Sequence, residues 1–188
     1  GAALRGSTPT GSELKMTASM VVDGYNVLCA DERLRSLRED DFEAARETLI
    51  SDLVDYCDRE ECEMEVVFDA AGAGGAESHE KRSRYLDVTF TAGGKTADSY
   101  IEGFIYAVPK SGVRAVTIVT GDWELQRIAS GAGLLRMSSR EFLEELCQSE
   151  ERWRTEPRGR GPHRRRVRLD ERIPRDVRAA LERFRRKQ

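Results

Sequence analysis

The sequence predicts an α/β fold with a mostly parallel central sheet and helices on both of its faces. Short apolar runs alternate along the chain with segments whose apolar residues recur at helical spacing, and this alternation is typical of parallel sheets with crossover helices. In addition, acidic residues close the runs SMVVD, MEVVFD and VTIVTGD, at the points where strands are expected to end.

The first half of the chain is predicted to contain three strands and one long helix. Residues 18–22 form a short apolar strand. From Asp41 to about Tyr56, apolar residues return every three or four positions, which predicts an amphipathic helix. The second and third strands lie on either side of a glycine-rich loop at residues 70–78, and we place them at 64–68 and 86–90.

In the second half, Thr96 is the predicted N-cap of a helix that Pro109 ends. The residues of this helix that should face the core are Ile101, Phe104, Ile105 and Val108. A buried strand, a helix, a short strand and a further helix then follow at residues 113–120, 123–130, 134–138 and 139–147.

Charge divides the chain into two parts. Residues 1–151 contain 16 Lys and Arg against 29 Asp and Glu, a net charge of −13, whereas residues 152–188 contain 15 against 5, a net charge of +10. We expect a disordered N-terminal extension at 1–17, a folded domain at 18–150 and a basic extension at 151–188 that ends in a short helix. A basic tail on an acidic body suggests a polyanionic partner.

Several classes of protein are disfavoured. The four cysteines lack CxxC spacing, so neither a zinc site nor a disulfide framework is expected. We therefore expect the protein in a reducing compartment. No run approaches the ~20 apolar residues that span a bilayer, so we expect a soluble protein without a membrane partner.

Four aspartates stand where a strand should end or a helix should begin: Asp23, Asp69, Asp98 and Asp122. Because the carboxyl ends of parallel strands lie along one edge of a sheet, these side chains should converge there. Carboxylates bind Mg²⁺ together with water and substrate phosphates, and metal ions can stabilise both oxygens of a phosphodiester displacement. The set therefore points to a nuclease, although each aspartate alone also fits a role as a helix cap or turn former.

Neighbouring residues strengthen this interpretation. Gly24 is expected to permit a tight turn after Asp23, and the Asn26 amide could hold that carboxylate. Asp98 and Glu102 are four residues apart and share one helix face.

Two motifs that would indicate other enzyme classes are incomplete. GGKT at 93–96 resembles the end of a P-loop, but the glycine required five positions before Gly94 is Thr89, so no nucleotide cofactor is expected. A phosphoaspartate enzyme would carry a second Asp where Tyr25 stands.

Basic and aromatic residues are candidates for contact with nucleic acid. The basic side chains that could bind backbone phosphates are Lys81, Arg82, Arg84, Arg164, Arg165, Arg166 and Arg168. For the first three, ordinary solvation of a loop is an equal alternative. Trp123 could stack on a base, but we favour a role in anchoring the start of its helix in the core.

Four motifs, VVDGYN at 21–26, VVFDA at 66–70, GGKTADSYIE at 93–102 and VTGDWELQ at 119–126, resemble those of the NYN-domain ribonucleases. These enzymes are relatives of PIN nucleases, and the resemblance is closest to their YacP-like branch, which includes a bacterial endonuclease of the ribosomal A site. The resemblance covers roughly residues 18–186. It implies a PIN-like three-layer fold, Mg²⁺- or Mn²⁺-dependent RNA cleavage, and action on messenger RNA at the ribosome.

The residues that match the family's catalytic pattern are Asp23, Asn26, Asp98 and Asp122, with Asp69 and Glu102 as supporting acids at the metal. One position departs from the pattern, because many PIN-like enzymes carry another acid where Gln126 stands. The sequence therefore predicts a metal-dependent endoribonuclease, with a non-catalytic RNA- or ribosome-binding module as the alternative. As the location of a YacP-like protein, the bacterial cytoplasm and the plastid stroma are both consistent with the sequence, and the N-terminal segment slightly favours the plastid.

Overall fold

The computed structural model describes residues 19–70, 75–108 and 116–155. In this part of the chain six strands form one sheet in the order β3-β4-β2-β1-β5-β6. Five of them are parallel: β1 (Ser19–Asp23), β2 (Glu63–Phe68), β4 (Leu86–Phe90), β5 (Val116–Val119) and β6 (Leu135–Met137). β3 (Ser78–Lys81) lies at one edge, antiparallel to β4. The predicted α/β fold with a mostly parallel sheet is confirmed.

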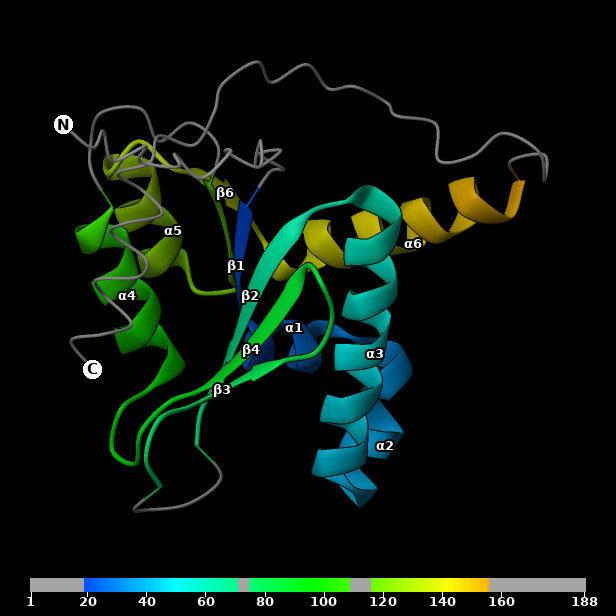
Figure 1. Ribbon diagram of the computed structural model, residues 1–188, viewed down its shortest axis with the longest axis horizontal. Coiled ribbons are helices and arrows are strands. Elements are labelled where there is room, and N and C mark those ends of the chain that lie inside the picture. Colours follow the sequence, from blue (N-terminus) through cyan, green and yellow to red (C-terminus); the bar gives the residue numbers. More distant parts are fainter. Residues whose placement is uncertain (1–18, 71–74, 109–115, 156–188) are drawn as a thin grey trace, which may run out of the picture.

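Helices cover both faces of the sheet, which gives three layers (Figure 1). α4 (Ala97–Ala107) and α5 (Trp123–Gly131) pack on one face, and α1 (Gly24–Ala30), α3 (Phe42–Glu60) and α6 (Ser139–Thr155) pack on the other. A 3₁₀ turn, η1 (Glu32–Leu34), and α2 (Arg35–Asp40) join α1 to α3. Because both faces are covered, the strands are apolar throughout rather than alternating.

Neighbouring residues of β1 illustrate the two cores. Val21 belongs to the core cluster that includes Phe104 of α4, whereas Val22 belongs to the cluster that includes Phe142 of α6. All four core positions predicted for α4 are buried, at 7% exposure or less. The predicted cap of this helix is also confirmed, since Thr96 Oγ1 accepts a hydrogen bond from Ser99 N at 3.1 Å.

Two helices are longer than their apolar periodicity predicts. α3 continues past Tyr56 to Glu60, and α6 continues past Cys147 to Thr155. Cys57, in the first of these extensions, is buried in the core. Ion pairs join the two helix ends, since Arg152 Nη2 lies 3.1 Å from Glu60 Oε1 and 2.9 Å from Glu145 Oε1. α6 also crosses position 151, where the composition of the chain changes.

Four elements were missed: α1, η1, α2 and β3. α1 follows β1 without any loop, because Asp23 both ends the strand and caps the helix. The residues of η1 and α2 give too short a periodic signal to be separated from the long helix that follows. β3 consists of the exposed residues SHEK and pairs only with β4, so it has no apolar pattern to reveal it.

Several predictions fall outside the described residues: the N-terminal extension, the centre of the glycine-rich loop, the start of the strand predicted at 113–120, and the basic tail with its terminal helix. Where the structure describes the chain, no helix is both long enough and apolar enough to cross a membrane. The four cysteines lie in this part and are free, with Cys57 and Cys62 buried.

Candidate active site

Asp23 is the most buried of the predicted site residues, with 1% of its surface exposed. It ends β1 and caps α1, where its Oδ1 accepts a hydrogen bond from Asn26 N at 3.0 Å. Its Oδ2 accepts hydrogen bonds from Asn26 Nδ2 and, at 3.2 Å, from Thr120 Oγ1. Both oxygens are therefore held in place, as expected if Asn26 positions this carboxylate.

Thr120 connects Asp23 to the neighbouring strand end. It is fully buried after β5, and its hydroxyl oxygen also accepts a hydrogen bond from Asp122 N at 3.0 Å. Asp122 in turn caps α5, with its Oδ1 accepting from Glu124 N at 2.7 Å. Sequence reasoning did not select Thr120, although a polar residue at the end of a buried strand was a signal available in the motif.

Asp69 and Asp98 join the same edge of the sheet. Asp69 follows β2, and its Oδ1 accepts a hydrogen bond from Ala97 N at the start of α4. Asp98 lies in the first turn of that helix, within hydrogen-bonding reach of Asp23. Partial burial of the Asp98 carboxyl, followed by the charges of Asp23, Asp122 and Asp69, raises its pKa from 3.8 to about 6.

The structure thus brings together the four predicted aspartates, Asp23, Asp69, Asp98 and Asp122, which we term the acidic cluster. α1, α4 and α5 begin at this edge. The partial positive charge of a helix N-terminus stabilises nearby anions. It offsets part of the repulsion among the four carboxylates, but the raised pKa of Asp98 indicates that repulsion remains.

Two glycines fit closely around the cluster. A Cβ atom on Gly24 would lie 2.4–2.7 Å from the ring of Phe68. The chain passes from β1 into α1 at this glycine without a positive φ, so the turn needs no left-handed backbone. Close packing against Phe68 is what requires a glycine here. A Cβ on Gly121 would lie 2.8 Å from Asn26 Oδ1, so this residue leaves room for the amide that orients Asp23.

Glu102 and Gln126 each lie one turn along a helix from a member of the acidic cluster. Glu102 follows Asp98 on α4 and is half-buried. Gln126 donates from Nε2 to the Thr120 carbonyl at 2.8 Å and accepts from Arg136 at 3.1 Å. The residue that replaces the expected acid therefore ties α5 to β5 and β6.

The basic cluster of residues 81–84 is not brought to the acidic cluster. Lys81 pairs with Asp87 across β3 and β4, at the end where β4 begins, whereas the aspartates lie beyond the end where it stops. The length of the strand, roughly 15 Å, separates the two sites. Arg82 also forms ion pairs, with Glu47 at 2.5 Å and Glu80 at 3.2 Å, and the Arg84 guanidinium lies 5.3 Å from the Tyr85 ring. The predicted tail arginines are outside the described residues.

Trp123 is exposed over 69% of its surface, so the favoured prediction that it anchors α5 in the core is wrong. The buried side chains of this helix are Leu125 and Ala129. With 3.6 residues per turn, Trp123 lies about 200° around the helix from Leu125, which places it on the opposite face.

The donor set of the acidic cluster suits a hard divalent cation, because it consists of carboxylate oxygens whose crowding a cation would relieve. Across the described residues, however, no three His, Cys, Asp or Glu side chains are arranged to hold one ion. A bound cation would therefore need side-chain rotation at Asp69, Asp98 or Asp122, or oxygens supplied by the substrate.

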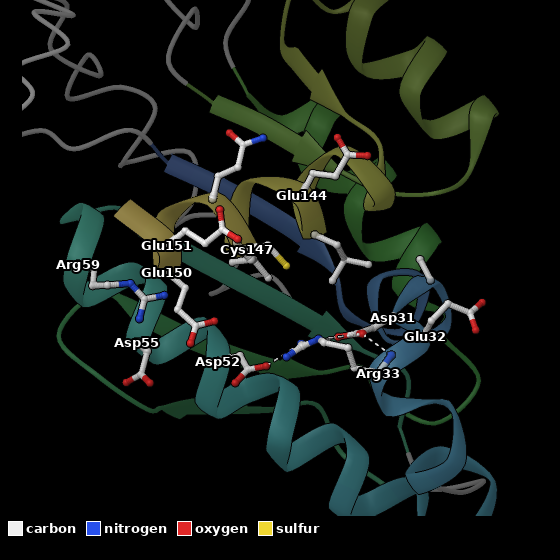
Figure 2. A pocket seen from close by; sticks show the side chains of 14 residues that line it. Asp31, Glu32, Arg33, Asp52, Asp55, Arg59, Glu144, Cys147, Glu150 and Glu151 are labelled. Atoms are coloured by element: carbon white, nitrogen blue, oxygen red, sulfur yellow. Dashed lines mark hydrogen bonds and ion pairs between the residues drawn. The ribbon is translucent and has the colours of Figure 1, made fainter. Parts of the chain in front are cut away.

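A separate groove of about 620 Å³ lies between the end of α1, α3 and α6. Arg33 crosses it, 2.6 Å from Asp31 and 2.9 Å from Asp52 (Figure 2). No member of the acidic cluster lines this groove, so it is not part of the candidate active site.

Known proteins resemble this chain in sequence and in structure. A match to the YacP-like NYN domain family covers residues 20–186. The protein YacP of Bacillus subtilis (strain 168) is 35% identical over 133 residues, which are 71% of this chain and 77% of YacP. A crystal structure of Rae1 (YacP) from Bacillus subtilis, at 33% identity, covers 72% of this chain and 76% of that chain with a TM-score of 0.59. The crystal structure of a tryptophan-to-leucine variant of that protein, at 32% identity, matches 73% of this chain and 79% of that chain, also with a TM-score of 0.59.

These matches agree with the resemblance seen in the four motifs, and they support a nuclease-like function related to RNA. The aspartates of the acidic cluster all lie within the matched range. The chain belongs to the YacP-like NYN domain family.

Proposed function

We propose that the chain is a metal-dependent endoribonuclease whose active site is the acidic cluster. The observation that carries this proposal is the convergence of four aspartates from three strand ends and one helix start on a single edge of the sheet. Like charges are seldom crowded in this way without a functional reason, because the crowding destabilises the folded state.

Mg²⁺ or Mn²⁺ is the proposed cofactor. Asp23, Asp98 and Asp122 would hold it, supported by Asp69 and Glu102. When bound, the cation would supply charge stabilisation for the displacement at phosphorus.

The chain's own residues would contribute a preorganised environment. Asn26 and Thr120 fix Asp23 before substrate arrives, so no reorganisation is needed at that carboxylate during the reaction. Asp98, with a pKa of about 6, changes from neutral to charged just below neutral pH. Cleavage should therefore increase with pH through this range, because the charged form is the one that binds a cation.

We propose messenger RNA, in association with the ribosome, as the substrate. The similarity to the YacP-like branch supports this choice, as does the net charge of +10 on residues 152–188. Arg164, Arg165, Arg166 and Arg168 are better candidates for phosphate contacts than Lys81 and Arg82, since the latter two already pair with carboxylates. The Bacillus subtilis relatives favour the bacterial cytoplasm over the plastid stroma.

The test is the substitution Asp23→Asn, which removes the charge at nearly constant shape. Cleavage should fall by at least about a thousandfold because transition-state stabilisation depends on this charge, while RNA affinity should be retained or slightly increased. Cleavage of free RNA and of messenger RNA in translating ribosomes should both be measured with Mg²⁺ and with Mn²⁺. Asp55→Asn, the same change on the exposed surface of α3, is the matched control.

A second candidate function is an RNA- or ribosome-binding module without activity. Two features favour it. Gln126 stands where many PIN-like enzymes carry an acid, and in the described ranges no three His, Cys, Asp or Glu side chains are already arranged to hold a cation. A wild-type protein that binds RNA but cuts it in neither assay would support this function. Wild-type rates in Asp23→Asn would instead refute the catalytic role of that carboxylate.

A further inference from the structure

We propose that Trp123 and Tyr25 are base-stacking platforms on either side of the acidic cluster, so that the substrate is single-stranded RNA with an unpaired base on each side of the cleaved phosphate. This inference rests on the proposed ribonuclease function and specifies how its substrate is held. It is supported by the position, exposure and neighbours of the two aromatic residues.

Trp123 directly follows Asp122, so their Cα atoms are about 3.8 Å apart. The indole is 69% exposed, on the side of α5 away from the core. Arg127, one turn later, holds its guanidinium 5.8 Å from the ring. Among the described residues no carboxylate forms an ion pair with Arg127. The pair therefore offers an apolar ring for a base and a cation for a phosphate.

Tyr25 lies in the first turn of α1, after β1, much as Trp123 begins α5 after the neighbouring strand β5. It lies two residues after Asp23, is 49% exposed, and packs its ring 6.0 Å from that of Phe42. The residue before it, Gly24, packs against the ring of Phe68, the last residue of β2. Tyr25 therefore follows a residue that contacts the strand leading to Asp69.

The sheet order places these residues on opposite sides of Asp23. β1, which ends at Asp23, lies between β2 and β5. Tyr25 follows Gly24, which packs against the end of β2, whereas Trp123 begins the helix that follows β5. A strand of RNA that passes over Asp23 would therefore meet one aromatic ring before the acidic cluster and the other after it.

The chemistry favours unpaired bases. Carboxylates repel phosphates, so the affinity of this edge for RNA must come from contacts beside the cluster. Stacking on an aromatic side chain supplies such affinity without sequence selection, because every base has a π-face. In a duplex these faces are already stacked on each other and cannot reach an exposed indole or phenol.

Tryptophan fluorescence provides a direct test, since the chain has only two tryptophans. In a full-length protein carrying Asp98→Asn, which keeps the RNA intact, Trp153→Phe leaves Trp123 as the single indole. Addition of a single-stranded oligoribonucleotide should quench this fluorescence in proportion to binding, which is followed separately by the anisotropy of labelled RNA. The same sequence as a duplex should leave the fluorescence unchanged.

Affinity gives a second readout. Trp123→Ala and Tyr25→Ala should each weaken binding of the single strand about tenfold, whereas Trp123→Phe and Tyr25→Phe, which keep a ring, should lose less. Tyr106→Ala is the matched control, because this tyrosine is 72% exposed in the last turn of α4, about 12 Å along the helix from Asp98. Melting temperatures check that each variant is folded.

The outcomes separate this inference from the proposed function. Single-stranded RNA that binds without quenching Trp123, with unchanged affinity in Trp123→Ala, would overturn the platforms and leave the nuclease assignment to the Asp23→Asn test. Quenching by the single strand alone would support the platforms even if wild-type protein failed to cleave. Failure of the full-length protein to bind RNA at all would overturn the platforms.

Discussion

At the scale of single residues, Asp98 is a member of the acidic cluster whose pKa is raised by its surroundings. Its pKa is about 6 in the folded protein against an ordinary value of 3.8. Between these pH values the folded state holds a proton that the unfolded state has lost. The contribution of Asp98 to the free energy of unfolding therefore falls as pH rises from about 4 to about 6, and it stays lower above that range.

Replacement of Asp98 by Asn should remove this penalty. Without divalent cations, Asp98→Asn should be more stable than the wild type at pH 8 by about 1 kcal/mol, a figure reduced for solvent screening because the residue is exposed. The two proteins should converge at about pH 3 and below, where the carboxyl is mostly neutral in both states. Urea unfolding between about pH 3 and pH 8 measures the difference.

Cations should affect the two proteins differently. Millimolar Mg²⁺ or Mn²⁺ should raise the melting temperature of the wild type, because ligands that bind only the folded state stabilise it, and Asp98→Asn should lose most of this increase. Equal responses in both proteins, or none in either, would argue against a cation held by Asp98. Asp55→Asn again controls for the loss of a surface charge.

At the scale of elements, helix starts and strand ends supply both the capping groups and the acids of the site. Asp23 caps α1, Asp122 caps α5, and Asp69 accepts a hydrogen bond from the first residue of α4. Each of the three carboxylates therefore has a structural role in addition to its place in the cluster. Substitution by alanine alone cannot distinguish the two roles.

Asp69 offers a way to separate them. Asp69→Ala should destabilise the protein by about 1 kcal/mol, since the N–H group of Ala97 loses its acceptor. Asp69→Asn keeps an acceptor oxygen and should retain most of the stability, but its cleavage rate should fall roughly tenfold if the charge supports the cation. Thermal unfolding and RNA cleavage of the two variants measure these effects. Full activity in Asp69→Asn would restrict Asp69 to capping.

At the scale of the whole molecule, the distribution of charge is the main feature. The first 151 residues carry a net charge of −13, and the remaining 37 carry +10. An acidic body repels RNA, so the basic tail is expected to supply the long-range attraction, and the acidic cluster is the proposed site of cleavage. Deletion of the tail tests this division.

A protein that ends at Thr155, the last residue of α6, should bind RNA more weakly and with a shallower dependence on salt. Deletion of residues 156–188 removes 13 basic and 5 acidic residues, and fewer counterions are then released on binding. The slope of log K against log salt concentration is the quantity to measure, with circular dichroism to confirm folding. An unchanged slope in a folded truncation would show that the tail does not bind the polyanion.

The sequence by itself determined the order of most elements, the helix cap at Thr96, and the edge of the sheet at which the four aspartates meet. Such features depend on local signals: apolar periodicity, capping side chains, and the rule that parallel strands end at one edge. The core positions of α4 followed from the same periodicity. Short or polar elements such as α1 and β3 escaped because they carry too little of that signal.

Only the tertiary structure decided how residues distant in sequence meet. It linked Thr120 to Asp23, placed Phe68 against Gly24, exposed Trp123, and separated residues 81–84 from the acidic cluster by the length of a strand. It also raised the pKa of Asp98 through charges that lie up to 75 positions away, at Asp23. Packing and electrostatic interactions of this kind depend on distances in space, which a linear pattern of residue types does not contain.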